Sequence, residues 1–235
     1  MSASAAQYQE HKQGADAPAA VCLCVNIGCG TSVPDGWYNI DNSPTIWLSR
    51  IPLARRLFRV PAWPKNVRRH NVLKGLPFAD ARVDFIYSSH TFEHFTYEQS
   101  MALTKECLRV LKPGGILRIV VPDLARLVDD YLADPAPLAS HTLVKRLLLG
   151  HTWRDLLHPG AHHSQMFDAR SLLAMMREAG FENPVQSCFG ESRIPSVLSV
   201  ELEERKHESL YVEAEKILAP GPTSTLLPQV EPKRN

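Results

Sequence analysis

The sequence lacks an apolar run that could cross a membrane, since nowhere in its 235 residues do about 20 apolar positions follow one another. It also lacks an excess of charge of either sign, with 26 basic and 25 acidic residues, so net charge points to no particular partner. The first 20 residues lack a basic start followed by an apolar segment, which predicts no secretory signal peptide. Internal repeats are absent as well.

Cysteine is scarce, and its count of five is odd. Cys22, Cys24 and Cys29 crowd one predicted strand and turn, where alternating side chains could not pair easily. This arrangement favours reduced thiols, and we therefore expect a cytoplasmic protein.

No group of cysteine, histidine or acidic residues in the sequence gives strong evidence of a metal site. Cys22 and Cys24 lack the spacing and the second pair of a zinc site. His158, His162 and Asp168 have a spacing that a metal ion could use, but no tight cluster supports it. We therefore predict no metal site.

What the sequence does contain is organised around the segment from Val21 to Asp41. The apolar run at 21–27 predicts a buried central strand. Gly28 and Gly30 then allow a sharp turn and a close approach of the backbone to a ligand. A second short strand ends in Asp41, whose carboxylate can accept hydrogen bonds from both hydroxyls of a ribose. The segment predicts a nucleoside site.

The same turn lacks the features of a phosphate site. A P-loop ends in Lys and Ser/Thr, which are missing here. The dinucleotide fingerprint needs a third glycine and an acid about 20 residues further on, whereas this chain has Val33 and an acid at Asp41. A sulfonium nucleoside has no phosphates and fits the turn better.

Strands and helices alternate along most of the chain, which predicts an α/β fold with a mostly parallel sheet. We expect strands at 21–27, 38–41, 66–73, 83–89, 116–121, 185–189 and 208–216, and helices at 53–59, 98–111, 124–132, 140–149 and 168–179. The predicted organisation is a disordered leader at 1–19, one domain at 20–218 with insertions at about 42–65 and 126–163, and a proline-rich disordered tail at 219–235.

Several ordered motifs resemble those of class I S-adenosylmethionine-dependent methyltransferases, over about residues 21–217. They are NIGCG at 26–30, GWYNID at 36–41, DFIYSSH at 84–90, EHF at 93–95 and RVLKPGG at 109–115. The closest likeness is to the small bacterial branch of type 11-like methyltransferases often found beside sugar- and polysaccharide-modifying genes. The resemblance implies a Rossmann-like fold with an antiparallel last strand, and S-adenosyl-L-methionine as cofactor. It implies cofactor contacts at Gly28, Cys29, Gly30, Asp41, Asn42, Asn71, Val72, Leu73, Ser88 and Ser89.

Three departures from the family pattern stand out. Ser32 replaces a common third glycine, and Asn71 stands where an acid is frequent, which weakens adenine binding in principle. Only ten residues separate Gly30 from Asp41, so the first helix must be very short or missing. We therefore expect the two insertions to cover the cofactor.

Histidines are the candidate catalytic residues, because a hydroxyl acceptor of high pKa needs a base. His90 directly follows the fourth predicted strand, and His162 and His163 lie in a loop before the last core helix. The alternative for each is a structural or surface histidine. Glu93-His94 either contacts the cofactor or stabilises the helix that follows.

The stretch from Asn42 to Lys74 contains no acid and eight basic residues with interleaved apolar ones. The favoured interpretation is a helix with its guanidinium groups in solvent. The alternative is a cationic lid facing an anionic acceptor, or a peripheral membrane contact through 46–69.

The leading hypothesis is methyl transfer from S-adenosylmethionine to a hydroxyl or amine of a sugar, glycolipid or small natural product. The second is a non-catalytic, methyltransferase-like binding protein. A nucleic-acid methyltransferase ranks last, because the basic 50–74 stretch is its only support and no base-modifying motif follows the fourth strand. The oligomeric state is left open.

Overall fold

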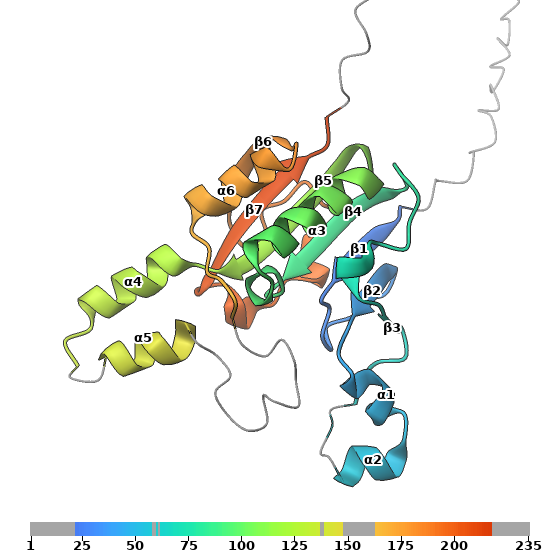
Figure 1. The fold of residues 1–235 in the computed structure, drawn as a ribbon, viewed down its shortest axis with the longest axis horizontal. Coiled ribbons are helices and arrows are strands. Elements are labelled where there is room, and N and C mark those ends of the chain that lie inside the picture. The colour runs from blue at the N-terminus through green and yellow to red at the C-terminus, as the bar shows by residue number, and fades with distance from the viewer. Residues whose placement is uncertain (1–21, 58–59, 61, 137–138, 148–162, 218–235) are drawn as a thin grey trace, which may run out of the picture.

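One seven-stranded sheet forms the centre of the molecule, in the order β3-β2-β1-β4-β5-β7-β6 (Figure 1). The computed structural model describes residues 22–57, 60, 62–136, 139–147 and 163–217. The strands are β1 (Cys24–Ile27), β2 (Trp37–Asp41), β3 (Val67–Arg69), β4 (Val83–Ser89), β5 (Leu111–Pro122), β6 (Glu182–Ser187) and β7 (Ser209–Glu215). The helices are α1 (Thr45–Ser49), α2 (Pro52–Leu57), α3 (Tyr97–Val110), α4 (Leu124–Ala133), α5 (Ala139–Leu147) and α6 (Ala169–Glu178).

Strands β1 to β5 pair in parallel, whereas β7 lies antiparallel between β5 and β6. This mixed sheet confirms the predicted Rossmann-like class with an antiparallel last strand. Parallel strands are joined by crossovers, so their carboxyl ends meet at one edge of the sheet. The residues that follow β1, β2 and β4 therefore converge there.

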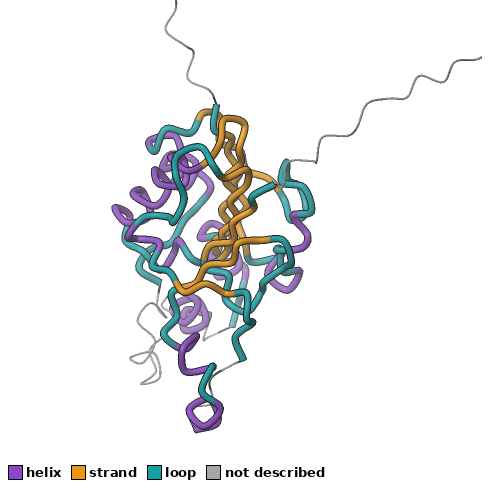
Figure 2. The backbone as a smooth tube through the Cα atoms, turned by 90° about the vertical axis from the view of Figure 1, so that its right-hand side faces the viewer, coloured by secondary structure: helices purple, strands orange, loops and turns teal. Residues whose placement is uncertain are grey.

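The two faces of the sheet are covered differently. Apolar side chains of α3 and α6 pack with those of the sheet in the largest core cluster, and Figure 2 shows the sheet edge-on between its two covering layers. Over β4, β5 and β7 the opposite face is covered by the irregular segment 188–208, through Ile194, Val197 and Val200. This segment was not anticipated, because it has no helical period.

Helix α3 begins and ends where its sequence dictates. The hydroxyl of Thr96 accepts a hydrogen bond from Gln99 N, and the Gln99 side chain accepts one from Thr96 N, which together form a capping box. The helix buries Met101, Leu103 and Cys107 against the sheet at roughly helical spacing. It ends at Val110, and β5 follows at once.

In the 42–74 region the observed elements differ from the predicted ones in two respects. The third strand is only Val67–Arg69, because Asn71 Oδ1 accepts a hydrogen bond from Leu73 N (3.0 Å) and starts a single 3-10 turn at Val72–Lys74. Helix α1 was not predicted. No helix lies between Ile27 and Trp37, as expected from the short spacing. Within the described residues, no helix is both long and apolar enough to span a membrane.

Candidate functional site

A cavity of about 530 Å³ lies at the carboxyl ends of β1, β2 and β4. We call it the nucleoside pocket. Its volume falls within the range of about 300–1,000 Å³ typical of small-ligand sites. Its lining residues are Asn26, Ile27, Gly28, Cys29, Gly30, Thr31, Ser32, Asp41, Asn42, Ser43, Pro44, His70, Val72, Tyr87, Ser89, His90, Thr91, His94, Phe95, Val200, Leu202 and Arg205.

The glycine turn is held tightly against the rest of the pocket. Gly28 and Gly30 have φ values of +67° and +53°, a region that residues with a Cβ rarely adopt. The N–H groups of Gly28 and Cys29 both donate to Ile40 O, at 2.9 and 3.1 Å. A Cβ on Gly28 would lie 1.9 Å from Thr91 Oγ1, so no side chain fits there. The turn therefore needs glycine both for its conformation and for its packing.

The carboxylate of Asp41 is fixed at the floor of the pocket. Its Oδ2 accepts a hydrogen bond from Gly30 N (3.0 Å), and its Oδ1 accepts one from Ser43 N (2.7 Å). A carboxylate oxygen can accept more than one hydrogen bond, so both oxygens keep acceptor capacity for a pair of ligand hydroxyls. This arrangement fits the ribose of a nucleoside.

Two buried asparagines take the place of the missing first helix. Asn26 Nδ2 donates to Ser32 O (3.0 Å) and to Asn39 Oδ1 (3.1 Å). Asn39 Nδ2 donates to the carbonyls of Pro34 (3.4 Å) and Trp37 (3.0 Å). Because these bonds satisfy the backbone of an irregular loop, the 28–36 segment keeps its shape without helical hydrogen bonds.

The predicted cofactor residues fall into two groups. Seven of them line the nucleoside pocket, namely Gly28, Cys29, Gly30, Asp41, Asn42, Val72 and Ser89. Asn71 caps the 3-10 turn and lies in a neighbouring hollow, and Leu73 is 39% exposed and does not line the pocket. Ser88 is fully buried and donates to Ile27 O (3.2 Å), which ties β4 to β1.

His90 lines the pocket directly after β4. Its φ of +48° is left-handed, which is uncommon for a residue with a side chain and is frequent at functional sites. Its Nε2 lies 2.9 Å from Ser209 Oγ, and its Nδ1 lies 3.5 Å from a carboxylate oxygen of Glu93. Burial lowers the pKa of His90 to about 3, so its ring is neutral and weakly basic.

The other two candidate histidines lie in the second insertion. His162 and the neighbouring His158 lie outside the described residues. His163 is partly buried, does not line the pocket, and has its ring centroid 5.3 Å from that of His94. Burial, and secondarily His94, lowers the pKa of His163 to about 4.

The far wall of the pocket comes from the 188–208 segment, which sequence reasoning missed. Val200, Leu202 and Arg205 line the pocket, whereas of the first insertion only Asn42, Ser43 and Pro44 do, and of the described part of the second insertion none does. Among the described residues, this segment therefore shares the cover of the pocket with the start of the first insertion. No periodicity or motif marks it in the sequence.

A buried ion pair holds this wall in place. Arg118 on β5 is fully buried, and its Nε donates to Glu201 Oε1 (2.6 Å). Its Nη2 donates to Cys188 O (2.8 Å), while Glu201 Oε2 accepts from Gly190 N (2.6 Å). These bonds tie the start of the wall segment, at Cys188, and its residue Glu201 to β5.

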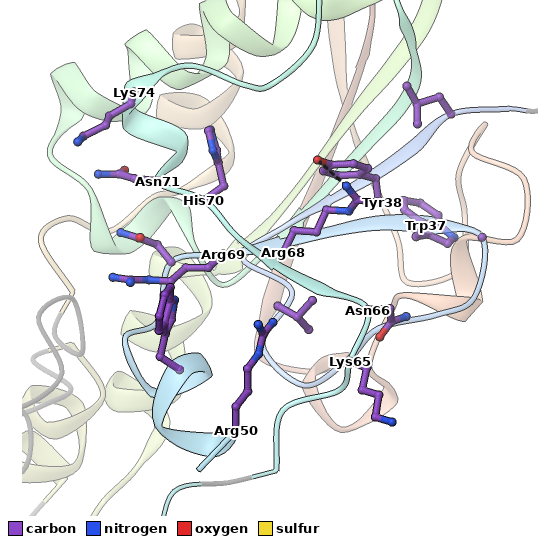
Figure 3. A pocket seen from close by; sticks show the side chains of 15 residues that line it. Trp37, Tyr38, Arg50, Lys65, Asn66, Arg68, Arg69, His70, Asn71 and Lys74 are labelled. Atoms are coloured by element: carbon purple, nitrogen blue, oxygen red, sulfur yellow. Dashed lines mark hydrogen bonds between the residues drawn. The ribbon is translucent and has the colours of Figure 1, made fainter. Parts of the chain in front are cut away.

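A second hollow, of about 920 Å³, lies beside the edge strand β3 (Figure 3). We call it the cationic groove. Figure 3 shows basic side chains around it, namely Arg50, Lys65, Arg68, Arg69 and Lys74, and no acidic residue is among the described residues that line it. The guanidinium of Arg68 lies 4.2 Å from the ring centroid of Tyr38. The groove shares Asn42 and His70 with the nucleoside pocket, so the two are neighbours.

Comparison with known proteins shows which family has this sequence and fold. The sequence profile of the methyltransferase domain family matches residues 12–185, more than half of the chain. A Mycolicibacterium smegmatis protein, named a probable S-adenosylmethionine-dependent methyltransferase, is 36% identical over 61 residues. That match covers 26% of this chain and 23% of the relative, so the chain aligns with about a quarter of the curated protein's length.

Solved structures with a similar fold are more distant in sequence. A Thermotoga maritima S-adenosylmethionine-dependent methyltransferase, described as a possible histamine N-methyltransferase, is 20% identical, with a TM-score of 0.44 over 83% of this chain and 82% of that one. An Archaeoglobus fulgidus S-adenosylmethionine-dependent methyltransferase is 15% identical, with a TM-score of 0.46 over 83% and 86%. Neither likeness indicates the methyl acceptor of this chain.

Proposed function

The chain belongs to the methyltransferase domain family, in its class I, S-adenosylmethionine-dependent form, and from that premise we propose that it methylates a hydroxyl or amine of a sugar, glycolipid or small natural product. One observation carries the proposal. The nucleoside pocket combines a glycine turn, a fixed carboxylate and an absence of phosphate-binding features at the carboxyl edge of the sheet.

Each part of the pocket has a proposed task. The backbone of Gly28 and Gly30 lies against the methionine and ribose portions, and Asp41 accepts hydrogen bonds from the ribose hydroxyls. Val72 packs beside the adenine, and Ser89 borders the reacting end. The bound cofactor supplies an electrophilic methyl group on a sulfonium sulfur.

The contribution of the chain to the chemistry is chiefly alignment. Holding donor and acceptor in line lowers the barrier without a charged catalytic group. His90 lines the pocket but is weakly basic, since a base works best with a pKa near the working pH. We therefore assign His90 to positioning the acceptor, and we keep acceptor contact by His162 or His163 as a proposal.

The exposed surface of α1 and α2 has the composition of a membrane-binding surface, which would bring the enzyme to an acceptor carried on a lipid. Trp47, Leu53 and Leu57 on α1 and α2 are 64%, 76% and 72% exposed, and Arg55 and Arg56 lie among them. Apolar side chains interleaved with arginine favour the interface of an anionic membrane. We propose that the 46–69 segment makes a peripheral contact there, from the cytoplasmic side.

The cationic groove favours a second candidate function. Its five basic side chains and its open shape suit a polyanion, so a nucleic-acid acceptor ranks second on this observation. A protein that binds the cofactor without turnover is the remaining alternative.

The test is transfer of a labelled methyl group. The full chain is incubated with methyl-labelled S-adenosylmethionine and, separately, with simple glycosides, lipid-linked sugars in vesicles, amine-bearing small molecules and RNA or DNA oligonucleotides. Label in a sugar, lipid or small molecule supports the proposal, and the Asp41→Ala variant should lose it. Label only in oligonucleotides would favour the second candidate, and cofactor binding without label in any acceptor would favour the binding protein.

A further inference from the structure

A buried carboxylate beside the nucleoside pocket has no hydrogen-bond partner among the described residues. Glu93 is 1% exposed, and neither of its carboxylate oxygens has a hydrogen-bond partner among the described residues. His90 Nδ1 lies 3.5 Å from its Oε1. An ionised carboxylate without a counter-charge is costly to bury, so this side chain needs either a proton or a cation.

Two imidazoles face the same carboxylate. Ligand atoms of Glu93, His94 and His163 all lie within 4.8 Å of one another. Atoms bound at about 2.1 Å to a single tetrahedral ion lie roughly 3.5 Å apart, so small rotations of these side chains bring all three to one ion. The three residues thus form a compact nitrogen–nitrogen–oxygen set.

The ring of His163 is oriented as a ligand would be. It makes a hydrogen bond with the backbone of Leu147, and its Nδ1 is buried with no partner among the described residues. A histidine that binds a metal through one nitrogen usually donates its other N–H to a carbonyl or carboxylate, which fixes the tautomer. Since Nδ1 has no partner, the bond to Leu147 is made by Nε2, and Nδ1 is the nitrogen left available to an ion.

The cluster is also held together by its surroundings. Ser164 N and Gln165 N both donate to Glu93 O, at 2.7 and 3.2 Å, and Ser164 Oγ donates to His94 O at 3.0 Å. Gln165 Nε2 donates to Ser100 Oγ at 2.7 Å on α3. These bonds fasten the 163–165 segment to the turn at 92–94, so two distant parts of the sequence meet in a defined geometry.

We propose that Glu93, His94 and His163 bind one divalent transition-metal ion, for which Zn²⁺ is the best match. Two imidazole nitrogens and one carboxylate oxygen suit Zn²⁺ and its neighbours, whereas Mg²⁺ and Ca²⁺ prefer oxygen ligands alone. Three protein ligands leave a coordination position for water or another small ligand. His94 also lines the nucleoside pocket, so the ion lies in the wall of that pocket. The sequence analysis predicted no metal because only the fold brings these residues together.

The test measures metal binding alone, without cofactor or acceptor. The full, tag-free chain is treated with chelator and titrated with Zn²⁺ by calorimetry and with Co²⁺ by visible absorption. We expect one tight ion per chain and a Co²⁺ spectrum of low coordination number. Glu93→Gln and His163→Ala should each weaken binding about tenfold or more, since even outer-shell changes cost 10–100-fold.

Matched controls separate this site from the other histidines of the chain. His207→Ala removes an exposed histidine and Glu98→Gln an exposed carboxylate, and both should bind Zn²⁺ as the wild type does. At one fixed Zn²⁺ concentration, the Tm of the wild type and of both controls should rise by the same amount, and the Tm of Glu93→Gln should rise by less. Absence of one-to-one binding in the wild type, or full binding in both Glu93→Gln and His163→Ala, would overturn the proposal and leave Glu93 as a neutral buried carboxyl. Neither result bears on methyl transfer, which the labelled-methyl experiment tests separately.

Discussion

The nucleoside pocket and the cationic groove are neighbours of similar scale, yet they are built by different means. The pocket is shaped by backbone, with Gly28 and Gly30 in a conformation that side chains disfavour, with no space for a Cβ at Gly28, and with Asp41 fixed by two N–H groups. The groove is shaped by long side chains on an edge strand, such as Arg68 and Arg69, which are exposed.

The difference bears on what each region can recognise. A backbone-defined pocket is preorganised and can select one ligand shape, because little ordering entropy remains to be lost. Flexible, exposed cations attract any anion of suitable charge, and their effect falls with salt. We therefore expect changes in the pocket to be large and specific, and changes in the groove to be small and electrostatic.

The largest effect is expected where the pocket wall is anchored. Arg118→Met leaves Glu201 buried without its partner, and breaking a buried pair in this way costs about 3–5 kcal/mol. Arg68→Met in the groove removes an exposed cation–π contact worth about 0.5–1 kcal/mol. Denaturant unfolding of the two variants measures both losses. Equal losses would mean that the two regions are not built differently.

Asp41→Asn is expected to act next most strongly, on cofactor affinity. Hydrogen bonds to a charged group contribute about 1.5–3 kcal/mol, so affinity for S-adenosylmethionine should fall roughly tenfold or more. Asp35→Asn changes an exposed acid of the 28–36 loop, before β2, and should bind normally. Calorimetric titration compares them, and unchanged affinity in Asp41→Asn would remove that residue from the site.

Two glycine-to-alanine variants, one at Gly28 in the pocket and one at Gly36 in the groove, compare the two regions by adding one methyl group to each. Gly28→Ala forces a Cβ into Thr91, and overpacking of this kind costs about 1–3 kcal/mol of folding stability. Because Gly28 and Thr91 both line the nucleoside pocket, their displacement should also lower cofactor affinity. Gly36 lines the groove with a φ of +80° and nothing within 4 Å of its missing Cβ. Gly36→Ala should therefore lose some stability from backbone strain alone and keep its affinity. Equal affinity losses would show strain rather than packing to be the cause.

The smallest effect on the cofactor is expected from the groove itself. Arg68→Glu with Arg69→Glu should leave affinity for S-adenosylmethionine within about twofold, because exposed charges are screened by salt. The same variant should weaken binding to a heparin column and lower the salt dependence of that binding. If this double variant lost as much cofactor affinity as Asp41→Asn, the groove would have to be part of the cofactor site.

Much of the fold could be predicted from local pattern. The apolar run at 21–27, the alternation at 83–89 and the helical period at 98–111 each led to the observed element, and the ordered motifs led to the methyltransferase family, which the profile match confirms. Pattern succeeds there because buried strands and amphipathic helices impose their own periods on the sequence.

The rest depends on contacts between residues far apart in the chain. Arg118 meets Glu201 across 83 positions, and Ser164 meets His94 across 70, and no local period records either pairing. The loop at 28–36 has no period at all, because two asparagine side chains take over the role of helical hydrogen bonds. The same holds for Glu93 and His163, which only the fold brings together.

The most direct test of the nucleoside pocket is a crystal structure of the chain with S-adenosylhomocysteine. We expect the ribose hydroxyls within hydrogen-bonding distance of the Asp41 carboxylate, the adenine beside Val72, and the sulfur at the end of the pocket formed by Ser89, His90 and Thr91. Ligand density in the cationic groove, or an empty nucleoside pocket at saturating ligand, would contradict it.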